Sequence, residues 1–194
     1  MAGLFALACA CTGTESSPDA GPDAGPDAGP DSGPDAGLSE RRIFVTNNVQ
    51  NAALGGIVGA DALCATQAAN ANLDGDFKAW LSTISSSASD RLTHSSVPYV
   101  RVDGTMVAND WDDLVDGAIL APINLDANGD LQTGDTWTGT LATGASYLAD
   151  DCAAFTSGSD GLALCGSIAA TNATWTDSMK PACSTPLRLY CIEQ

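Results

Sequence analysis

A single histidine and several aspartates are the side chains of this sequence that could perform acid–base chemistry. His94 stands in a Thr-His-Ser-Ser segment, and no Gly-x-Ser-x-Gly segment supplies the activated serine of a Ser-His-Asp hydrolase. Neighbouring acids occur at Asp112 and Asp113 and at Asp150 and Asp151. Glycosidases need two carboxylates that face each other across about 5–10 Å, and neighbours in sequence usually point apart. We therefore interpret His94 as a loop residue and both pairs as solvated caps or loop acids, and we expect no enzymatic activity.

A short acidic segment raises the question of a bound cation. Asp126, Asn128 and Asp130 alternate along the chain, and Asp135 follows nearby. The spacing has features of a calcium loop, but the glycine falls one place early and no acid stands at the twelfth position. The alternative is a hairpin turn at Asn128-Gly129. We favour the turn, keep calcium as the alternative, and expect no other cofactor.

The four tryptophans have two interpretations. They could line a groove for a sugar or a peptide, or they could fill the core. The residues are Trp80, Trp111, Trp137 and Trp175. We favour the core for Trp111 and Trp137 and leave the place of Trp175 more open.

Cysteine usage favours disulfides over metal. The non-repetitive part of the chain contains Cys64, Cys152, Cys165, Cys183 and Cys191. Their spacing is wide, no Cys-x-x-Cys occurs and histidine is nearly absent, so a zinc site is not expected. In an exported protein this set predicts two disulfides and one remaining thiol. Spacing alone does not give the connectivity.

The N-terminus predicts attachment to a membrane by lipid. Residues 4–9 (Leu-Phe-Ala-Leu-Ala-Cys) have the pattern of a bacterial lipoprotein processing site, with Cys9 as the acylated residue and Cys11 as the alternative. The leader lacks a basic residue and its apolar run is short, so an accidentally apolar terminus is the competing interpretation. We expect residues 1–11 to be the remnant of a lipoprotein signal. The protein would then be anchored at the bacterial outer membrane or cell surface.

A proline-rich repeat follows the leader. Residues 18–37 repeat Pro-Asp-Ala-Gly, with one serine in place of alanine at Ser32. Proline fixes φ, glycine adds freedom and the aspartates repel one another, so the segment stays extended and solvated. Residues 12–38 are therefore predicted to be a disordered linker.

Residues 39–194 have the size of one ordinary domain. The chain has a net charge of −17, and six of its acids lie in residues 1–38, which leaves about −11 on the domain. Its basic residues are scattered, apart from Arg41 and Arg42. We therefore expect no binding to nucleic acid, to anionic lipid or to heparin-like polyanions through a basic patch.

Patterning within the domain predicts an α+β fold with few helices, many short strands and long loops. An Ala-rich helix is expected at 60–71, with Cys64 facing inward, and a polar loop at 85–89. The expected strands lie at 42–46 and 187–192, and 77–82 is expected to be a short strand or a buried segment.

Two turn signals are more specific. Asp103-Gly104 between alternating runs predicts a hairpin that joins 98–102 to 105–108. Asp110 is expected to cap a short helix that ends by Gly117.

A set of residues spread from Ala60 to Glu193 is informative through its order and spacing. The residues are Ala60, Asp61, Cys64, Leu73, Gly75, Phe77, Ala79, Leu81, Ser82, Val97, Pro98, Trp111, Leu114, Gly117, Trp137, Thr138, Gly139, Thr140, Gly144, Cys152, Cys183, Cys191, Ile192 and Glu193. In this order and spacing the domain resembles endostatin, the C-terminal domain of collagens XV and XVIII. It is also similar to the leptospiral endostatin-like outer-membrane proteins and related lipoproteins, in Trp175-Thr176-Asp177 and Leu189-Tyr190-Cys191.

The resemblance implies a C-type-lectin-like fold with nested disulfides. Cys64–Cys191 would lie outside and Cys152–Cys183 inside. Cys165 has no counterpart and would be free or paired between chains. Animal endostatin binds heparin through clustered arginines and zinc through N-terminal histidines, and this domain lacks both, as it lacks the Glu-Pro-Asn signature of sugar-binding lectins.

These features predict a non-catalytic recognition or adhesion lipoprotein. The loops at 126–147 and 157–177 are expected to contact an extracellular protein or glycan. The bacterial relatives are associated with host matrix or serum proteins, and the resemblance implies a partner of that kind. The alternative is a structural envelope lipoprotein without a soluble ligand.

Overall fold

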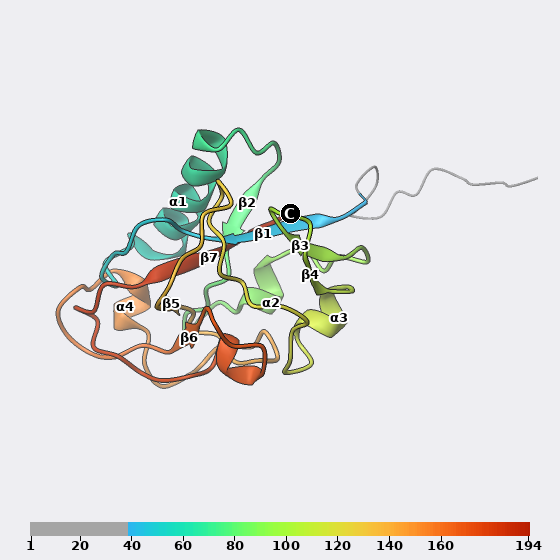
Figure 1. Ribbon diagram of the computed structural model, residues 1–194. Coiled ribbons are helices and arrows are strands. Elements are labelled where there is room, and N and C mark those ends of the chain that lie inside the picture. The colour runs from blue at the N-terminus through green and yellow to red at the C-terminus, as the bar shows by residue number, and fades with distance from the viewer. Residues whose placement is uncertain (1–38) are drawn as a thin grey trace, which may run out of the picture.

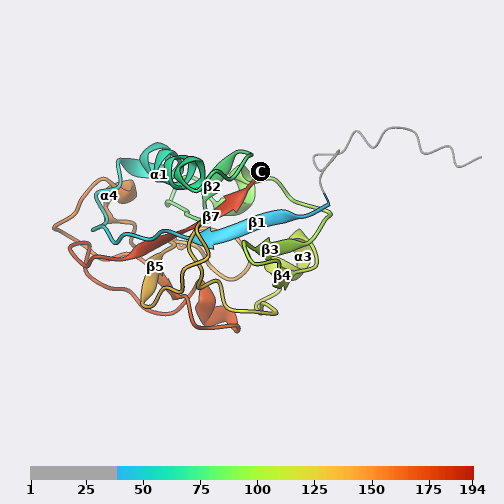
Figure 2. The same ribbon diagram turned by 45° about the horizontal axis from the view of Figure 1, so that its top comes forward.

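The computed structural model of the chain describes residues 39–194, which Figures 1 and 2 show from two directions. The lipidation candidates Cys9 and Cys11 and the predicted linker at 12–38 lie outside these residues. The described part is α+β, with few helices, a curled mixed sheet and two disulfides. This confirms the predicted α+β class.

A seven-stranded mixed sheet organises the domain. Its strands lie in the order β4-β3-β1-β7-β5-β6, and β2 also pairs with β7. The last strand, β7, has β1 antiparallel along one edge, and β5 and then β2 along the other. Their bounds are β1 (Arg41–Val45), β2 (Phe77–Ala79), β3 (Tyr99–Arg101), β4 (Met106–Ala108), β5 (Asp135–Trp137), β6 (Cys165–Ser167) and β7 (Arg188–Glu193).

The central strands are buried on both faces. Ile43 and Val45 pack in one apolar cluster, and Phe44 between them packs in the other. Successive side chains of a strand point to opposite faces, so β1 contributes to a core on each side of the sheet. In β7, Tyr190 joins the cluster of Ile43, and Cys191 joins that of Phe44.

One long helix and four short helical segments surround the sheet. They are α1 (Gly56–Asn70), α2 (Ala88–Arg91), α3 (Trp111–Leu114), α4 (Cys152–Phe155) and the 3-10 turn η1 (Ala173–Trp175). α1 packs on β2 and β7 (Figures 1 and 2). It buries Ala60, Cys64 and Ala68, whose small side chains let the helix axis approach the sheet. No helix among residues 39–194 is both long and apolar enough to cross a membrane.

Both specific turn predictions are confirmed. β3 and β4 form an antiparallel hairpin, and Gly104 takes the left-handed conformation with φ 81°. The Asp110 carboxylate accepts a hydrogen bond from the Asp113 N–H and caps α3, which ends at Leu114, before Gly117.

Other boundaries differ from the prediction. The Ala-rich helix begins four residues earlier, at Gly56. In the segment at 77–82, predicted as a short strand or a buried segment, the first half is the strand β2 and the second half is fully buried. The predicted loop at 85–89 is wrong in its second half. There, the Ser87 hydroxyl accepts the Asp90 N–H and starts α2.

Candidate functional site

His94 packs against an aromatic ring and bonds to a backbone carbonyl. Its exposed ring stacks on Trp111, with centroids 4.1 Å apart and planes 9° from parallel. Its Nε2 atom lies 2.8 Å from the carbonyl oxygen of Ser89, so its one ring hydrogen bond among residues 39–194 is to a backbone carbonyl and not to a serine hydroxyl. Beside the ring, a hollow of about 240 Å³ is also lined by Asp110 and Asp112.

The neighbouring aspartates hold backbone in place. Asp113 accepts hydrogen bonds from the backbone and side chain of Asn109. Asp151 accepts from the Ala154 N–H at 2.8 Å and from the Ile84 N–H at 3.0 Å, and so caps α4 and ties it to the loop before α2. These bonds fit the interpretation of the pairs as caps and loop acids.

The acidic segment forms the predicted turn. The carboxylate of Asp126 is buried, and its Oδ1 accepts the backbone N–H groups of Asn128 and Asp130 at 2.9 and 3.1 Å. Its Oδ2 accepts the side-chain amide of Gln132 at 2.8 Å, while Asp135 lies in β5. The Asp126 oxygens are therefore engaged with donors of their own loop. In residues 39–194, no three His, Cys, Asp or Glu side chains lie together in a way that could hold a metal ion.

All four tryptophans belong to the core. Trp80, Trp137 and Trp175 are fully buried and Trp111 is 5% exposed. Trp80 packs between Trp111 and Trp175 with tilted rings, whose centroids lie 5.8 and 5.1 Å away. The core interpretation is confirmed, and the alternative of an aromatic groove is wrong for the four of them.

The cysteines form the two pairings that the resemblance implies. Cys64 on α1 joins Cys191 in β7, and Cys152 joins Cys183. Cys165 is unpaired and fully buried in β6, and burial raises the pKa of its thiol to about 11. A thiol at that depth reaches another chain only if the domain opens, which argues against pairing between chains.

Exposed apolar side chains lie on the loops that follow β5. Leu148, Leu162 and Met179 are 70%, 41% and 55% exposed. The Nζ of Lys180 donates to the Tyr147 hydroxyl at 2.8 Å and lies 5.1 Å from the centre of its ring. This hydrogen bond raises the pKa of Lys180. We call these five residues the loop face.

The loops that carry the loop face are paired with one another by backbone bridges. Isolated bridges pair Asp151 with Ala163, Leu162 with Ala182 and Cys165 with Met179. The disulfide between Cys152 and Cys183 lies next to two of the bridged residues, Asp151 and Ala182. Only Leu162 and Tyr147 fall within the loops expected from sequence; the other three lie just beyond their ends.

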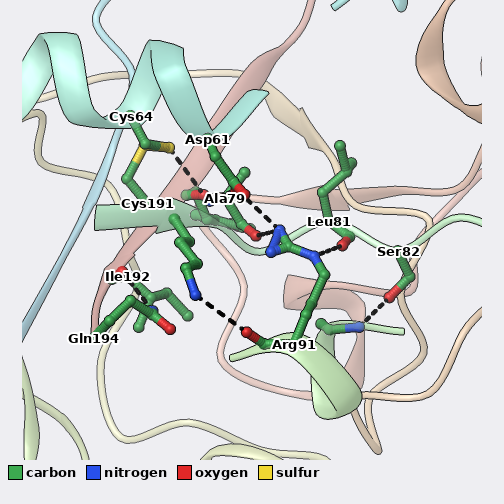
Figure 3. Close-up of polar contacts among 12 residues, drawn as sticks. Asp61, Cys64, Ala79, Leu81, Ser82, Arg91, Cys191, Ile192 and Gln194 are labelled. Carbon is green, nitrogen blue, oxygen red and sulfur yellow. Dashed lines mark hydrogen bonds and ion pairs between the residues drawn. A yellow bond between two sulfur atoms is a disulfide. The ribbon is translucent and has the colours of Figure 1, made fainter. Parts of the chain in front are cut away.

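A largely buried arginine beneath α1 was not predicted from the sequence (Figure 3). Arg91 at the end of α2 makes an ion pair of 3.0 Å with Asp61 on α1. It also donates to the carbonyls of Ala79 and Leu81. Burial lowers the pKa of Arg91, and Asp61 opposes that shift. The arrangement links α1, α2 and the segment after β2.

No known family model and no curated protein matches the sequence.

Proposed function

We propose that the chain is a non-catalytic recognition lipoprotein of the bacterial cell surface. Its folded head would bind an extracellular protein or glycan through its loops, at the end of the linker at 12–38. Acylation at Cys9, or at Cys11, would hold it to the outer membrane.

We further propose that the head belongs with the endostatin-like, C-type-lectin-like domains. Three features support this. The first and last strands pair antiparallel, one disulfide ties α1 to the last strand, and a second lies inside it in sequence. Between the first and the last strand, long loops follow β5 and α4.

The loop face is the observation that carries the proposal. Interfaces gain most of their binding energy from a few apolar or aromatic anchors on a surface that is already ordered. Met179 is such a side chain, exposed on backbone that pairs with Cys165, and the exposed Leu148 follows Tyr147, whose N–H donates to the Gly139 carbonyl. The fixed Tyr147–Lys180 pair adds a polar group and a positive charge to a strongly acidic domain.

The test measures binding of the full chain to immobilised matrix proteins, serum proteins and glycans. The variant Leu148→Ser with Met179→Ser should weaken binding at least tenfold, because each change removes an exposed apolar anchor. Val58→Ser is the matched control: Val58 is 81% exposed on α1, outside the loop face, and should bind as wild type. Circular dichroism checks that all variants fold.

Two outcomes would contradict the proposal. Undiminished binding by the double variant would exclude the loop face. Absence of binding to every immobilised probe, with the lipid found on Cys9 or Cys11 by mass spectrometry, would favour the structural envelope lipoprotein instead.

A further inference from the structure

We infer that a second site, a hollow beside α1, binds one uncharged sugar ring without a metal ion. The hollow has a volume of about 250 Å³. It lies where the loop after β1, the C-terminal half of α1 and the Asp126 turn meet (Figure 1). Its lining, here called the amide hollow, consists of Asn47, Asn48, Leu63, Thr66, Gln67, Asn70, Ala127 and Asn128.

The lining selects a neutral polar ligand. Five of its eight residues carry side-chain amides, one carries a hydroxyl, and none carries a charge. An amide places donors beside an acceptor, which matches adjacent hydroxyls, each a donor and an acceptor at once. A charged ligand would lose hydration without gaining an opposite charge. In a domain with about −11 net charge, a hollow lined only by neutral groups favours an uncharged polyhydroxyl ligand.

Two of the five amides, those of Gln67 and Asn48, are held in place before any ligand arrives. Gln67 is only 8% exposed. Its Oε1 accepts the Asn47 N–H at 2.9 Å, and its Nε2 donates to the Asn48 Oδ1 at 2.6 Å. The two N–H donors of the Asn48 amide thus remain for a ligand, and the loop after β1 is fixed against the helix. Preorganised donors lower the entropic cost of binding.

Three further side-chain amides have hydrogen-bonding groups that are open to a ligand. The side chains of Asn47, Asn70 and Asn128 make no hydrogen bond within residues 39–194, although each lines the hollow. Asn128 is positioned by its backbone N–H, which donates to Asp126. These side chains supply donors and acceptors from three sides of the hollow.

Size and shape favour a single ring over a peptide. Pockets for drug-sized ligands have volumes of about 300–1,000 Å³, so the amide hollow suits a smaller molecule. Leu63 and Ala127 provide apolar surface for the C–H groups of a sugar ring. A peptide would need an extended groove or a free strand edge, and none of the lining residues lies in a strand. The ring is a free monosaccharide or one residue of a glycan.

This inference rests on the proposal that the head is a recognition module, but it uses residues outside the loop face. The experiment titrates the full chain with neutral hexoses and N-acetylhexosamines, by calorimetry and by amide chemical shifts. Asn70→Ala and Asn128→Ala should each weaken binding about 3- to 10-fold, the effect of one lost neutral hydrogen bond. Val58→Ala is the control on the same helix and should bind as wild type.

Further arms separate the alternatives. Binding should persist in EDTA, and a requirement for calcium would overturn the inference in favour of a cation at the Asp126 turn. The inference would also be overturned if the amide chemical shifts changed only at residues outside the hollow, or if no sugar of the panel bound. Binding to immobilised glycans without any binding to free monosaccharides would indicate a larger epitope and would count against this hollow as the site. If Leu148→Ser with Met179→Ser still abolishes binding to matrix proteins, the proposed function stands alone.

Discussion

Cys165 shows at the scale of one residue how burial controls reactivity. Its thiol is fully buried and its pKa is raised to about 11, so the reactive thiolate is scarce at neutral pH. We predict that a thiol reagent labels Cys165 in less than about a tenth of the native molecules at pH 8 within an hour, and labels it fully after unfolding in urea. Peptide mapping identifies the site, and Cys165→Ser provides the unlabelled control. Fast labelling at Cys165 in native protein would contradict its burial.

Asp103 offers a prediction about pH. Arg101 donates to both of its carboxylate oxygens, at 3.2 and 2.7 Å, and this hydrogen bonding lowers its pKa to about 2. Because the folded-state pKa lies below the unfolded value of 3.8, the stabilisation is complete above about pH 4 and is lost as pH falls through about 2. The pair is exposed, so its contribution is only a few tenths of a kcal/mol.

The measurement is a carboxyl chemical-shift titration of Asp103. Its midpoint should rise from about 2 toward 3.8 in Arg101→Gln and stay unchanged in Arg188→Gln, which removes an arginine elsewhere. A wild-type midpoint near 3.8 would show that the pair does not persist in solution.

Single residues were predictable where the signal is local. Asp110 caps the helix that follows it, and Asn128-Gly129 turns the chain, because each depends on atoms a few residues away. Arg91 was not predictable, since its partner Asp61 lies on another helix. The amide hollow also combines residues from three distant segments, and no spacing in the sequence marks it.

Among the elements, α4 is unusual because its backbone is left-handed. Cys152, Ala153, Ala154 and Phe155 have φ between 52° and 57°. Left-handed geometry costs roughly 1–2 kcal/mol for each residue with a Cβ, and glycine avoids that cost. The disulfide at Cys152 and the Asp151 cap hold this turn in place.

A matched pair of glycine substitutions tests the left-handed turn. Ala153→Gly should raise the free energy of unfolding by about 0.5–1 kcal/mol, because strain relief exceeds the entropy that glycine adds to the unfolded chain. Ala65→Gly, exposed on the right-handed α1, should lower it by about 1 kcal/mol. Urea denaturation measures both. If Ala153→Gly destabilised as much as Ala65→Gly, the turn would not be left-handed in solution.

Elements with strong local patterns were predicted, and those made by pairing were not. The Asp103-Gly104 hairpin and the Ala-rich helix were expected because turn and helix signals lie within them. β5 and β6 are three residues each and exist because they pair with β7 and with each other. α2 was missed because its four residues follow a serine-rich segment that looks like a loop.

At the scale of the whole molecule, the α+β class followed from sequence, and the sheet order did not. β7 ends the chain yet lies at the centre of the sheet, between β1 on one edge and β5 and β2 on the other. Such an arrangement depends on contacts between residues more than 100 positions apart, as in the pairing of Phe44 with Cys191. The Cys64–Cys191 disulfide spans a similar separation of 127 residues.

The two disulfides should therefore stabilise the molecule by different amounts. In the chain-entropy model, the 127-residue separation of Cys64–Cys191 contributes about 5 kcal/mol and the 31-residue separation of Cys152–Cys183 about 4 kcal/mol. Domains have total stabilities of about 5–15 kcal/mol, so the loss of either bridge should be severe. We predict that the double variant Cys64→Ala with Cys191→Ala lowers the free energy of unfolding more than Cys152→Ala with Cys183→Ala does.

Hydrogen exchange should separate the two bridges further. Without Cys152–Cys183, protection should fall first between residues 146 and 182, where the loop face lies, while β1 and β7 stay protected by their own pairing and by α1. Without Cys64–Cys191, protection should fall across β1, β2 and β7 together, because that bridge fastens α1 to the central strand. Cys165→Ala serves as the control that removes a sulfur without removing a crosslink. Equal loss of protection in both double variants would mean that the sheet and the loops unfold as one unit, and that the inner bridge has no separate role in ordering the loop face.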